Sequence, residues 1–368
     1  MWLDDLRPLH FGEADQGLRP SDDAFRDFGL AGDAVTEEVS AHLPFGQLRT
    51  FFRPGTVGPR VLVVAPIAGA YPFLMRDLVA ALLPAAGRVG VTDWPNARYL
   101  PSAAGRFGFA ENCLETAQMA RALGDGEAAV HMVGVCQGAL PAFAAACLLA
   151  DAGLPPASLS LIGGPIDPSR NPTRLWRVLQ ERSLEALEKQ VIEEVPAGFP
   201  GAGRWVFPAW RQMDAFALYL WRQGVCGGEL PFRLAFDDGD DPMRFPLARL
   251  CWTMMDVPGE FFMENVATIF RANALAKGSL MVGGRSVCPE ALSATTLLTI
   301  EGADDDISAQ GQTDAAHDLC RALPEPFHRR LVVPGSGHFG LFYGRRMRAT
   351  VLPALLEAMA TGEAARQA

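Results

Sequence analysis

The sequence predicts an α/β fold with a mostly parallel sheet, helices on both faces of that sheet, and a cap inserted between two of its strands. Short apolar runs that end in turn residues alternate with helical patterns through the first half of the chain. This rhythm stops between residues 167 and 290, and two further strand-like runs follow at 295–300 and 330–333. An interruption between strands of one sheet is most simply a cap folded over the strand ends.

The strand-like runs show no alternation of polar and apolar residues, which is typical of strands buried on both faces of a parallel sheet. Four of them lie in the first half, at Val61–Ala65, Val89–Thr92, Val130–Val135 and Leu159–Ile162. Helical patterns separate them, at Leu74–Leu83, Glu111–Leu123 and Leu140–Ala150, so we expect a βαβαβ order. Ahead of them, Glu37–Phe52 predicts an antiparallel hairpin at the sheet edge that turns near Pro44–Phe45–Gly46.

These patterns divide the chain into a core and two additions. We expect the α/β core at 36–166 and 291–358, the cap at 167–290 and an N-terminal extension at 1–35. The cap is rich in Trp, Phe, Met, Pro and Gly, with helices expected at Arg174–Glu193, Trp210–Trp221 and Phe261–Leu275. The tail, Thr361–Ala368, is predicted to be disordered.

Composition excludes several classes of protein. The 368 residues include 42 acidic and 32 basic side chains, which give a net charge of −10 without a basic block, so nucleic acid is not an expected partner. The N-terminus has no basic and apolar signal pattern, and no apolar stretch reaches the roughly 20 residues of a membrane span. Seven cysteines without a CxxC pair indicate reduced thiols in a cytoplasm rather than disulfides or structural zinc.

The strongest chemical signal is the run Gly134–Val135–Cys136–Gln137–Gly138 between a strand and a helix. This is the nucleophile-elbow pattern of α/β-hydrolases, with cysteine in place of serine. A sharp strand-to-helix turn leaves no room for neighbouring Cβ atoms, which accounts for the two glycines. A free cysteine elsewhere is usually a buried structural residue, and we interpret the other six in that way.

A thiol nucleophile needs a base, and the base needs a carboxylate that fixes its tautomer. In α/β-hydrolases the acid and then the histidine follow the nucleophile, each on a loop after a late strand. His338 lies on such a loop among three glycines. Three aspartates follow the preceding strand; we choose Asp305 as the acid and expect its neighbours to cap a helix that starts near Ile307–Ser308. The alternatives are Asp304, Asp306 and Asp167.

The oxyanion hole is expected to combine the backbone N–H of Gln137 with one from the loop after Val61–Ala65, at Ile67 or Ala68. The alternative is that this loop is an ordinary glycine-containing turn. The mechanism needs no cofactor. We expect no metal, because nothing near the three aspartates completes an oxygen cage.

Several further motifs resemble those of the intracellular polyhydroxyalkanoate (poly-3-hydroxybutyrate) depolymerases, which are cysteine α/β-hydrolases. The similarity spans roughly residues 36–352 and includes Thr92–Asp93–Trp94, Val135–Cys136–Gln137, Gly163–Gly164–Pro165–Ile166–Asp167, Glu301–Gly302 with Asp305–Asp306–Ile307–Ser308, and Pro334–Gly335 with Gly337–His338. The resemblance implies a Cys136–Asp305–His338 triad, a polyester or its oligomers as substrate, and the granule surface as the workplace. The chain departs from the family pattern at Gly138 and Ala70.

We therefore expect a cytoplasmic esterase that cleaves 3-hydroxyacyl esters through a thioester on Cys136. The residues expected to contact the substrate are Tyr71, Trp252 and Phe339. One alternative is an acyltransferase or thioesterase acting on 3-hydroxyacyl-CoA, and another is a non-catalytic granule-associated protein. The sequence does not fix an oligomeric state and leaves a homodimer open.

Overall fold

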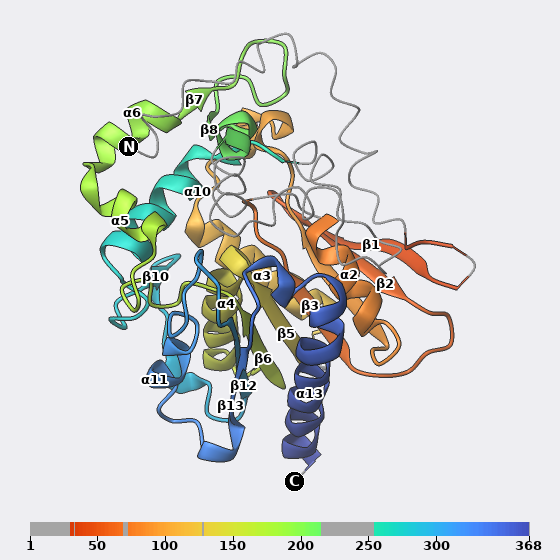
Figure 1. Cartoon of the computed structure of the whole chain (residues 1–368). Helices are drawn as coiled ribbons and strands as arrows, with labels where there is room; N and C mark the ends of the chain where they lie inside the picture. The colour runs from red at the N-terminus through yellow and green to blue at the C-terminus, as the bar shows by residue number, and fades with distance from the viewer. Residues whose placement is uncertain (1–29, 33, 69–72, 127–128, 215–253, 368) are drawn as a thin grey trace.

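The protein folds around an eight-stranded sheet with strand order β1-β2-β4-β3-β5-β6-β12-β13 (Figure 1). This computed structural model describes residues 30–32, 34–68, 73–126, 129–214 and 254–367. β1 and β2 form the expected antiparallel hairpin, β2 pairs antiparallel with β4, and the remaining neighbours are parallel. The strands are β1 Thr36–His42, β2 Gln47–Phe52, β3 Arg60–Val64, β4 Arg88–Asp93, β5 Val130–Val135, β6 Ser158–Ile162, β12 Thr296–Gly302 and β13 His328–Val333.

Helices cover both faces of this sheet, as the sequence predicts (Figure 1). α3 (Phe109–Leu123) and α4 (Ala139–Asp151) pack with one set of strand side chains, which includes Leu62 and Met132. α2 (Phe73–Leu82) and α13 (Leu352–Gln367) pack with the alternate set, which includes Val63 and Val133. Both sets are buried, which explains why the strands are apolar without alternation.

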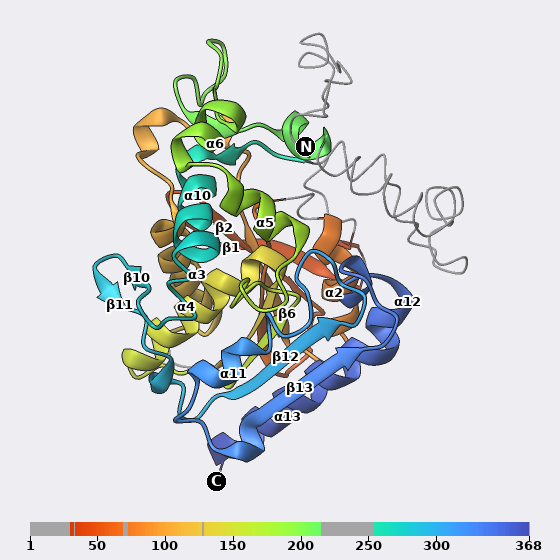
Figure 2. The same ribbon diagram turned by 60° about the vertical axis from the view of Figure 1, so that its left-hand side comes forward.

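The cap elements leave the sheet after β6 and return at β12, and those between residues 174 and 207 gather at the end of the molecule opposite the C-terminus (Figures 1 and 2). They are α5 Arg174–Glu181, α6 Leu184–Val191, β7 Glu193–Glu194, β8 Trp205–Phe207, β9 Val257–Pro258, α10 Gly259–Glu264, η5 Asn265–Arg271, β10 Met281–Val282 and β11 Arg285–Ser286. The other short helices are η2 Ala97–Tyr99, η3 Ser102–Ala104, η4 Cys136–Gly138, η6 Pro289–Ala291, α11 Ala315–Leu319, η7 Glu325–Phe327, η8 Phe339–Leu341, α12 Gly344–Arg346 and η9 Met347–Val351.

A buried ion pair attaches the cap to the loop after β4. Arg98 Nε donates to Asp256 Oδ2 at 2.7 Å, and the Asp256 side chain is completely buried. The other carboxylate oxygen accepts the N–H of Ala209 at 2.8 Å, while Asn96 Oδ1 accepts the N–H of Asp256 at 3.2 Å. These contacts join two cap segments, at Ala209 and Asp256, to one core loop. The Asn96–Ala97–Arg98 segment therefore has a structural role.

Three local expectations are wrong. The helix expected at 174–193 is two helices, because Ser183 Oγ accepts the N–H of Ala186 and starts α6 separately. The segment after Asp305 forms turns, and helix α11 begins only at Ala315. The tail is helical as far as Gln367 rather than disordered.

The predicted helix at 210–221 extends beyond residue 214, so most of it lies outside the described residues. Among the described helices, none combines the length and the apolar character needed to cross a membrane.

Candidate active site

Cys136 lies at a strained turn between β5 and α4. Its φ of 53° is in the left-handed region, which non-glycine residues rarely adopt. A Cβ at Gly134 would lie 2.7 Å from Ala139 Cα, and a Cβ at Gly138 would overlap the carbonyl oxygen of Val64. The turn is therefore as tight as the nucleophile-elbow pattern requires, and it leaves the Cys136 thiol half-buried rather than buried in the core.

His338 and Asp305 meet on the loops that follow β13 and β12. The distance from His338 Nδ1 to Asp305 Oδ2 is 2.7 Å, and both residues are buried. The other Asp305 oxygen accepts the N–H groups of Ile307 and Ser308, each at 2.9 Å. With the carboxylate fixed from both sides, the His338 ring has one orientation relative to Asp305.

The second nitrogen of His338 faces the opposite way. Nε2 is buried and has no conventional hydrogen-bond partner among the described residues. Burial alone would lower the pKa of His338, but the charges of Asp305 and Cys136 outweigh it and raise this pKa well above its ordinary value. His338 is thus arranged to hold a proton beside Cys136 while Asp305 supports the positive charge.

Aromatic rings surround the imidazole. The ring of Phe339 lies edge-on at 5.6 Å from that of His338, and the ring of Phe342 lies edge-on at 5.5 Å. Phe339 is a sequence-predicted contact, whereas Phe342 was not predicted because nothing in its pattern separates it from a core residue. Tyr71 and Trp252, the other two predicted substrate contacts, lie outside the described residues.

Glu301 fixes the loop that carries the acid, a role that its sequence context does not predict. Its carboxylate is buried at the end of β12 and accepts the N–H groups of Gly311, Thr313 and Asp314 at 2.8 to 3.0 Å. Burial raises the pKa of Glu301 despite these hydrogen bonds. This capture of backbone donors also explains why the segment forms turns where a helix was expected.

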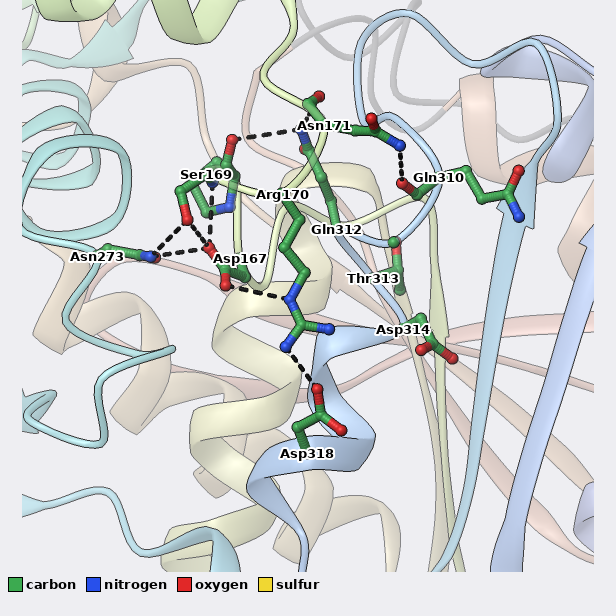
Figure 3. Close-up of polar contacts among 12 residues, drawn as sticks. Asp167, Ser169, Arg170, Asn171, Asn273, Gln310, Gln312, Thr313, Asp314 and Asp318 are labelled. Carbon is green, nitrogen blue, oxygen red and sulfur yellow. Dashed lines mark hydrogen bonds and ion pairs between the residues drawn. The ribbon is translucent and has the colours of Figure 1, made fainter.

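Asp167, the alternative acid from the earlier strand, has other partners (Figure 3). It accepts hydrogen bonds from the Ser169 N–H at 3.1 Å, from Asn273 Nδ2 at 2.8 Å and from Arg170 Nε at 3.3 Å. Burial opposes ionisation, but the hydrogen bonds from Ser169 and Asn273 lower its pKa overall. Asp167 therefore links the loop after β6 to the cap, and the structure places Asp305 beside His338 instead.

The loop after β3 lies against the elbow, as an oxyanion hole requires. The Ala68 N–H donates to the Gln137 side-chain oxygen Oε1 at 3.0 Å. Ile67 is 1% exposed, and its N–H makes no hydrogen bond with another described residue. The backbone N–H of Gln137 is in the first turn of η4–α4, where helix geometry supplies no acceptor. Of the two loop donors predicted, Ile67 is the one left available.

The sheet order, the strained cysteine turn and the position of the histidine loop define an α/β-hydrolase. The family model described as the PHB depolymerase C-terminus matches residues 163–362, more than half of the chain, so the chain belongs to this family and is a carboxylic ester hydrolase. A monoglyceride lipase of Saccharomyces cerevisiae superposes with a TM-score of 0.52 at 12% identity, over 90% of this chain and 97% of the lipase, which shows a shared fold.

Two esterases superpose less closely. Carboxyl esterase 2 of Tuber melanosporum has a TM-score of 0.48 at 15% identity, with 90% of this chain and 88% of the esterase covered. A thermophilic esterase of Thermogutta terrifontis has a TM-score of 0.49 at 15% identity, with 89% and 98% covered. A search of curated proteins finds no match.

Proposed function

We propose that the protein hydrolyses ester bonds of poly(3-hydroxyalkanoate), or of its oligomers, through a Cys136–His338–Asp305 triad. The observation that carries this proposal is the position of His338, which bonds Asp305 through Nδ1 at 2.7 Å and lies close enough to Cys136 for the charge of that sulfur to help raise the pKa of His338. The membership of the PHB depolymerase family supports a hydroxyalkanoate polyester as the substrate. With a polyester as the substrate, the enzyme would act at the surface of a cytoplasmic polyester granule.

In the acylation half-reaction, His338 takes the proton of the Cys136 thiol, and Asp305 supports the resulting imidazolium. The sulfur attacks the ester carbonyl carbon, so a carbon–sulfur bond forms and the carbonyl electron pair moves onto oxygen. Backbone N–H groups of Gln137 and Ile67 hold this oxyanion. When the carbon–oxygen ester bond breaks, His338 returns its proton to the leaving alkoxide, which departs as a hydroxyl chain end.

In the second half-reaction, His338 removes a proton from water, and the hydroxide attacks the thioester carbonyl. The carbon–sulfur bond breaks, the product leaves as a 3-hydroxyacid end, and the proton returns to sulfur. The cycle needs only the side chains and backbone groups described above together with water.

The substrate class is tested by comparing kcat/KM for a 3-hydroxybutyrate trimer ester with that for 3-hydroxybutyryl-CoA, at low and high ionic strength. We expect the trimer to be the better substrate, and its rate to change little with salt, because a neutral ester makes no ionic contact. A preference for the thioester that is lost as salt rises would instead indicate recognition of CoA phosphates and an acyl-CoA hydrolase or acyltransferase.

A further inference from the structure

The elbow carries a side-chain contact that the triad does not use. The Gln137 side chain extends from the residue after the nucleophile to the loop that follows β3, where Oε1 accepts the Ala68 N–H at 3.0 Å. Its partner lies 69 positions away in the chain and next to Ile67, the predicted second donor of the oxyanion hole. The contact therefore joins the two backbone segments that supply the oxyanion hole.

Gly138 makes this contact possible. Without a side chain at 138, the end of β3 lies directly against the elbow, where a Cβ would overlap the Val64 carbonyl oxygen and come within 3.0 Å of the Ala65 carbonyl carbon. A larger residue at 138 would move the loop away from α4 and lengthen the bond between Gln137 and Ala68. Gly138 is one of the two departures from the family pattern noted above. It lets the loop approach closely enough for the bond between Gln137 and Ala68 to form.

Among the described residues, the backbone N–H of Gln137 is a free donor, whereas its side-chain oxygen is an acceptor that is already occupied. This N–H lies at the start of η4–α4, where no acceptor is supplied by the helix. The Ile67 N–H has no partner among the described residues, whereas the Ala68 N–H is satisfied by Oε1. The side chain therefore satisfies the donor next to the hole and leaves free the donor that would bind the oxyanion.

We infer that Gln137 is a positioning residue for the oxyanion hole: its side chain holds the β3 loop so that Ile67 N–H and its own N–H point at one carbonyl oxygen. The inference rests on the proposed function. Oxyanion donors act only when they are placed before the charge develops, and a displacement of about 1 Å costs up to about 10²-fold in rate. A single bond that sets the distance between two such donors therefore affects the chemical step more than substrate binding.

The test uses Gln137→Met, which keeps the length of the side chain and removes the acceptor. Gln47→Met is the matched control, because Gln47 on β2 donates through Nε2 to Asp93 on β4 at 2.6 Å, and β3 separates this pair from β5 and the elbow. We expect Gln137→Met to lower kcat for a 3-hydroxybutyrate trimer ester about 10- to 100-fold with little change in KM. The melting temperature of Gln137→Met should remain close to wild type. The control loses a hydrogen bond to the buried Asp93 carboxylate, so its melting temperature should fall while its kcat and KM stay close to wild type.

Alkylation of Cys136 by iodoacetamide separates this role from a general disturbance of the site. Alkylation occurs at a saturated carbon and forms no oxyanion, so its rate in Gln137→Met should stay within about twofold of wild type while ester turnover falls. Unchanged kcat, a rise in kcat/KM, or a parallel fall in alkylation would each overturn the inference. A rise would mean that the side chain blocks the hole, and a parallel fall would mean that it acts on the thiol.

A Cys136→Ala variant distinguishes the failure of this inference from that of the proposed function. If Cys136→Ala retains turnover, the proposed function is wrong and the positioning role falls with it. If Cys136→Ala is inactive and Gln137→Met is fully active, only the positioning role is wrong.

Discussion

Replacing Asp305 by Asn changes which nitrogen of His338 carries a proton. In Asp305→Asn the side-chain oxygen can still accept the N–H groups of Ile307 and Ser308, which leaves the amide NH₂ facing His338 Nδ1 at the present 2.7 Å contact. Because NH₂ only donates, Nδ1 must become an acceptor and the ring proton moves to Nε2. Nε2 then cannot take the thiol proton of Cys136. The fold should be unaffected, since both backbone contacts remain.

The expected loss follows from this wrong tautomer. The equivalent change in a serine triad lowers kcat by about 10⁴, and we expect a fall of about 10³ to 10⁴ here, or about 4–5 kcal/mol of transition-state stabilisation. The substitution also removes the carboxylate that most raises the pKa of His338, so the imidazolium is disfavoured and alkylation of Cys136 near neutral pH should slow.

The assay measures kcat on the 3-hydroxybutyrate trimer ester in Asp305→Asn, with two controls of the same chemistry. Asp304 is exposed, and Asp167 is bonded to Ser169, Asn273 and Arg170, so Asp304→Asn and Asp167→Asn should keep kcat within a few-fold of wild type. A well-folded Asp305→Asn that keeps more than a tenth of the wild-type kcat would refute the assignment of the acid. So would a well-folded Asp167→Asn whose kcat falls further than that of Asp305→Asn.

Two further predictions concern stability. Arg98→Ala should lower the free energy of unfolding by about 3–5 kcal/mol, because it leaves the buried Asp256 carboxylate without its cation. Arg106→Ala, which removes the ion pairs of the exposed Arg106 with Glu264 and Glu111, should cost less than about 1 kcal/mol in the same urea titration, and equal losses would contradict this ranking. Burial, with the charge of Arg330, lowers the pKa of His317 to about 3. The unfolded chain therefore binds the proton first, and stability is lost as pH falls below about 6.5. Between pH 7.5 and pH 5.0, wild type should lose about 2 kcal/mol more than His317→Gln, and an identical pH dependence would show that His317 titrates normally.

Much of the geometry of the candidate site could be predicted because its signals are local. The elbow depends on glycines within two residues of Cys136. Backbone atoms approach these positions so closely that only glycine fits, and the sequence therefore shows glycine there. The strands and their helices could be predicted for a similar reason, since strands that are buried on both faces have to be apolar throughout.

The misassigned elements depend on partners that are distant in sequence. The segment after Asp305 is not helical because Glu301 takes its backbone N–H groups, and no local propensity reports that capture. The tail is ordered because Leu355 and Met359 are buried against the sheet and Glu363 Oε1 pairs with His131 Nε2 at 2.9 Å. The tail consists of alanine, charged residues, glycine and other polar residues, and this composition does not indicate that the helix it extends packs against the core.

The sequence favours Asp305 among three adjacent aspartates but does not supply the physical reason. Only the fold determines which carboxylate turns inward: Asp305 is buried with its oxygens on Ile307, Ser308 and His338, whereas Asp304 and Asp306 are exposed. The motif resemblance favoured Asp305, but the geometric reason is the turn that its own side chain closes.

The central claim is that an acyl group is carried on the sulfur of Cys136, and the acyl-enzyme itself is the most direct measurement. The enzyme is mixed with the 3-hydroxybutyrate trimer ester, quenched in acid within the first turnover, and digested for peptide mass spectrometry. We expect one hydroxyacyl adduct on the peptide that contains Cys136, removed by neutral hydroxylamine and absent from Cys136→Ala. An adduct on a serine, or rapid turnover with no adduct on Cys136, would contradict the account.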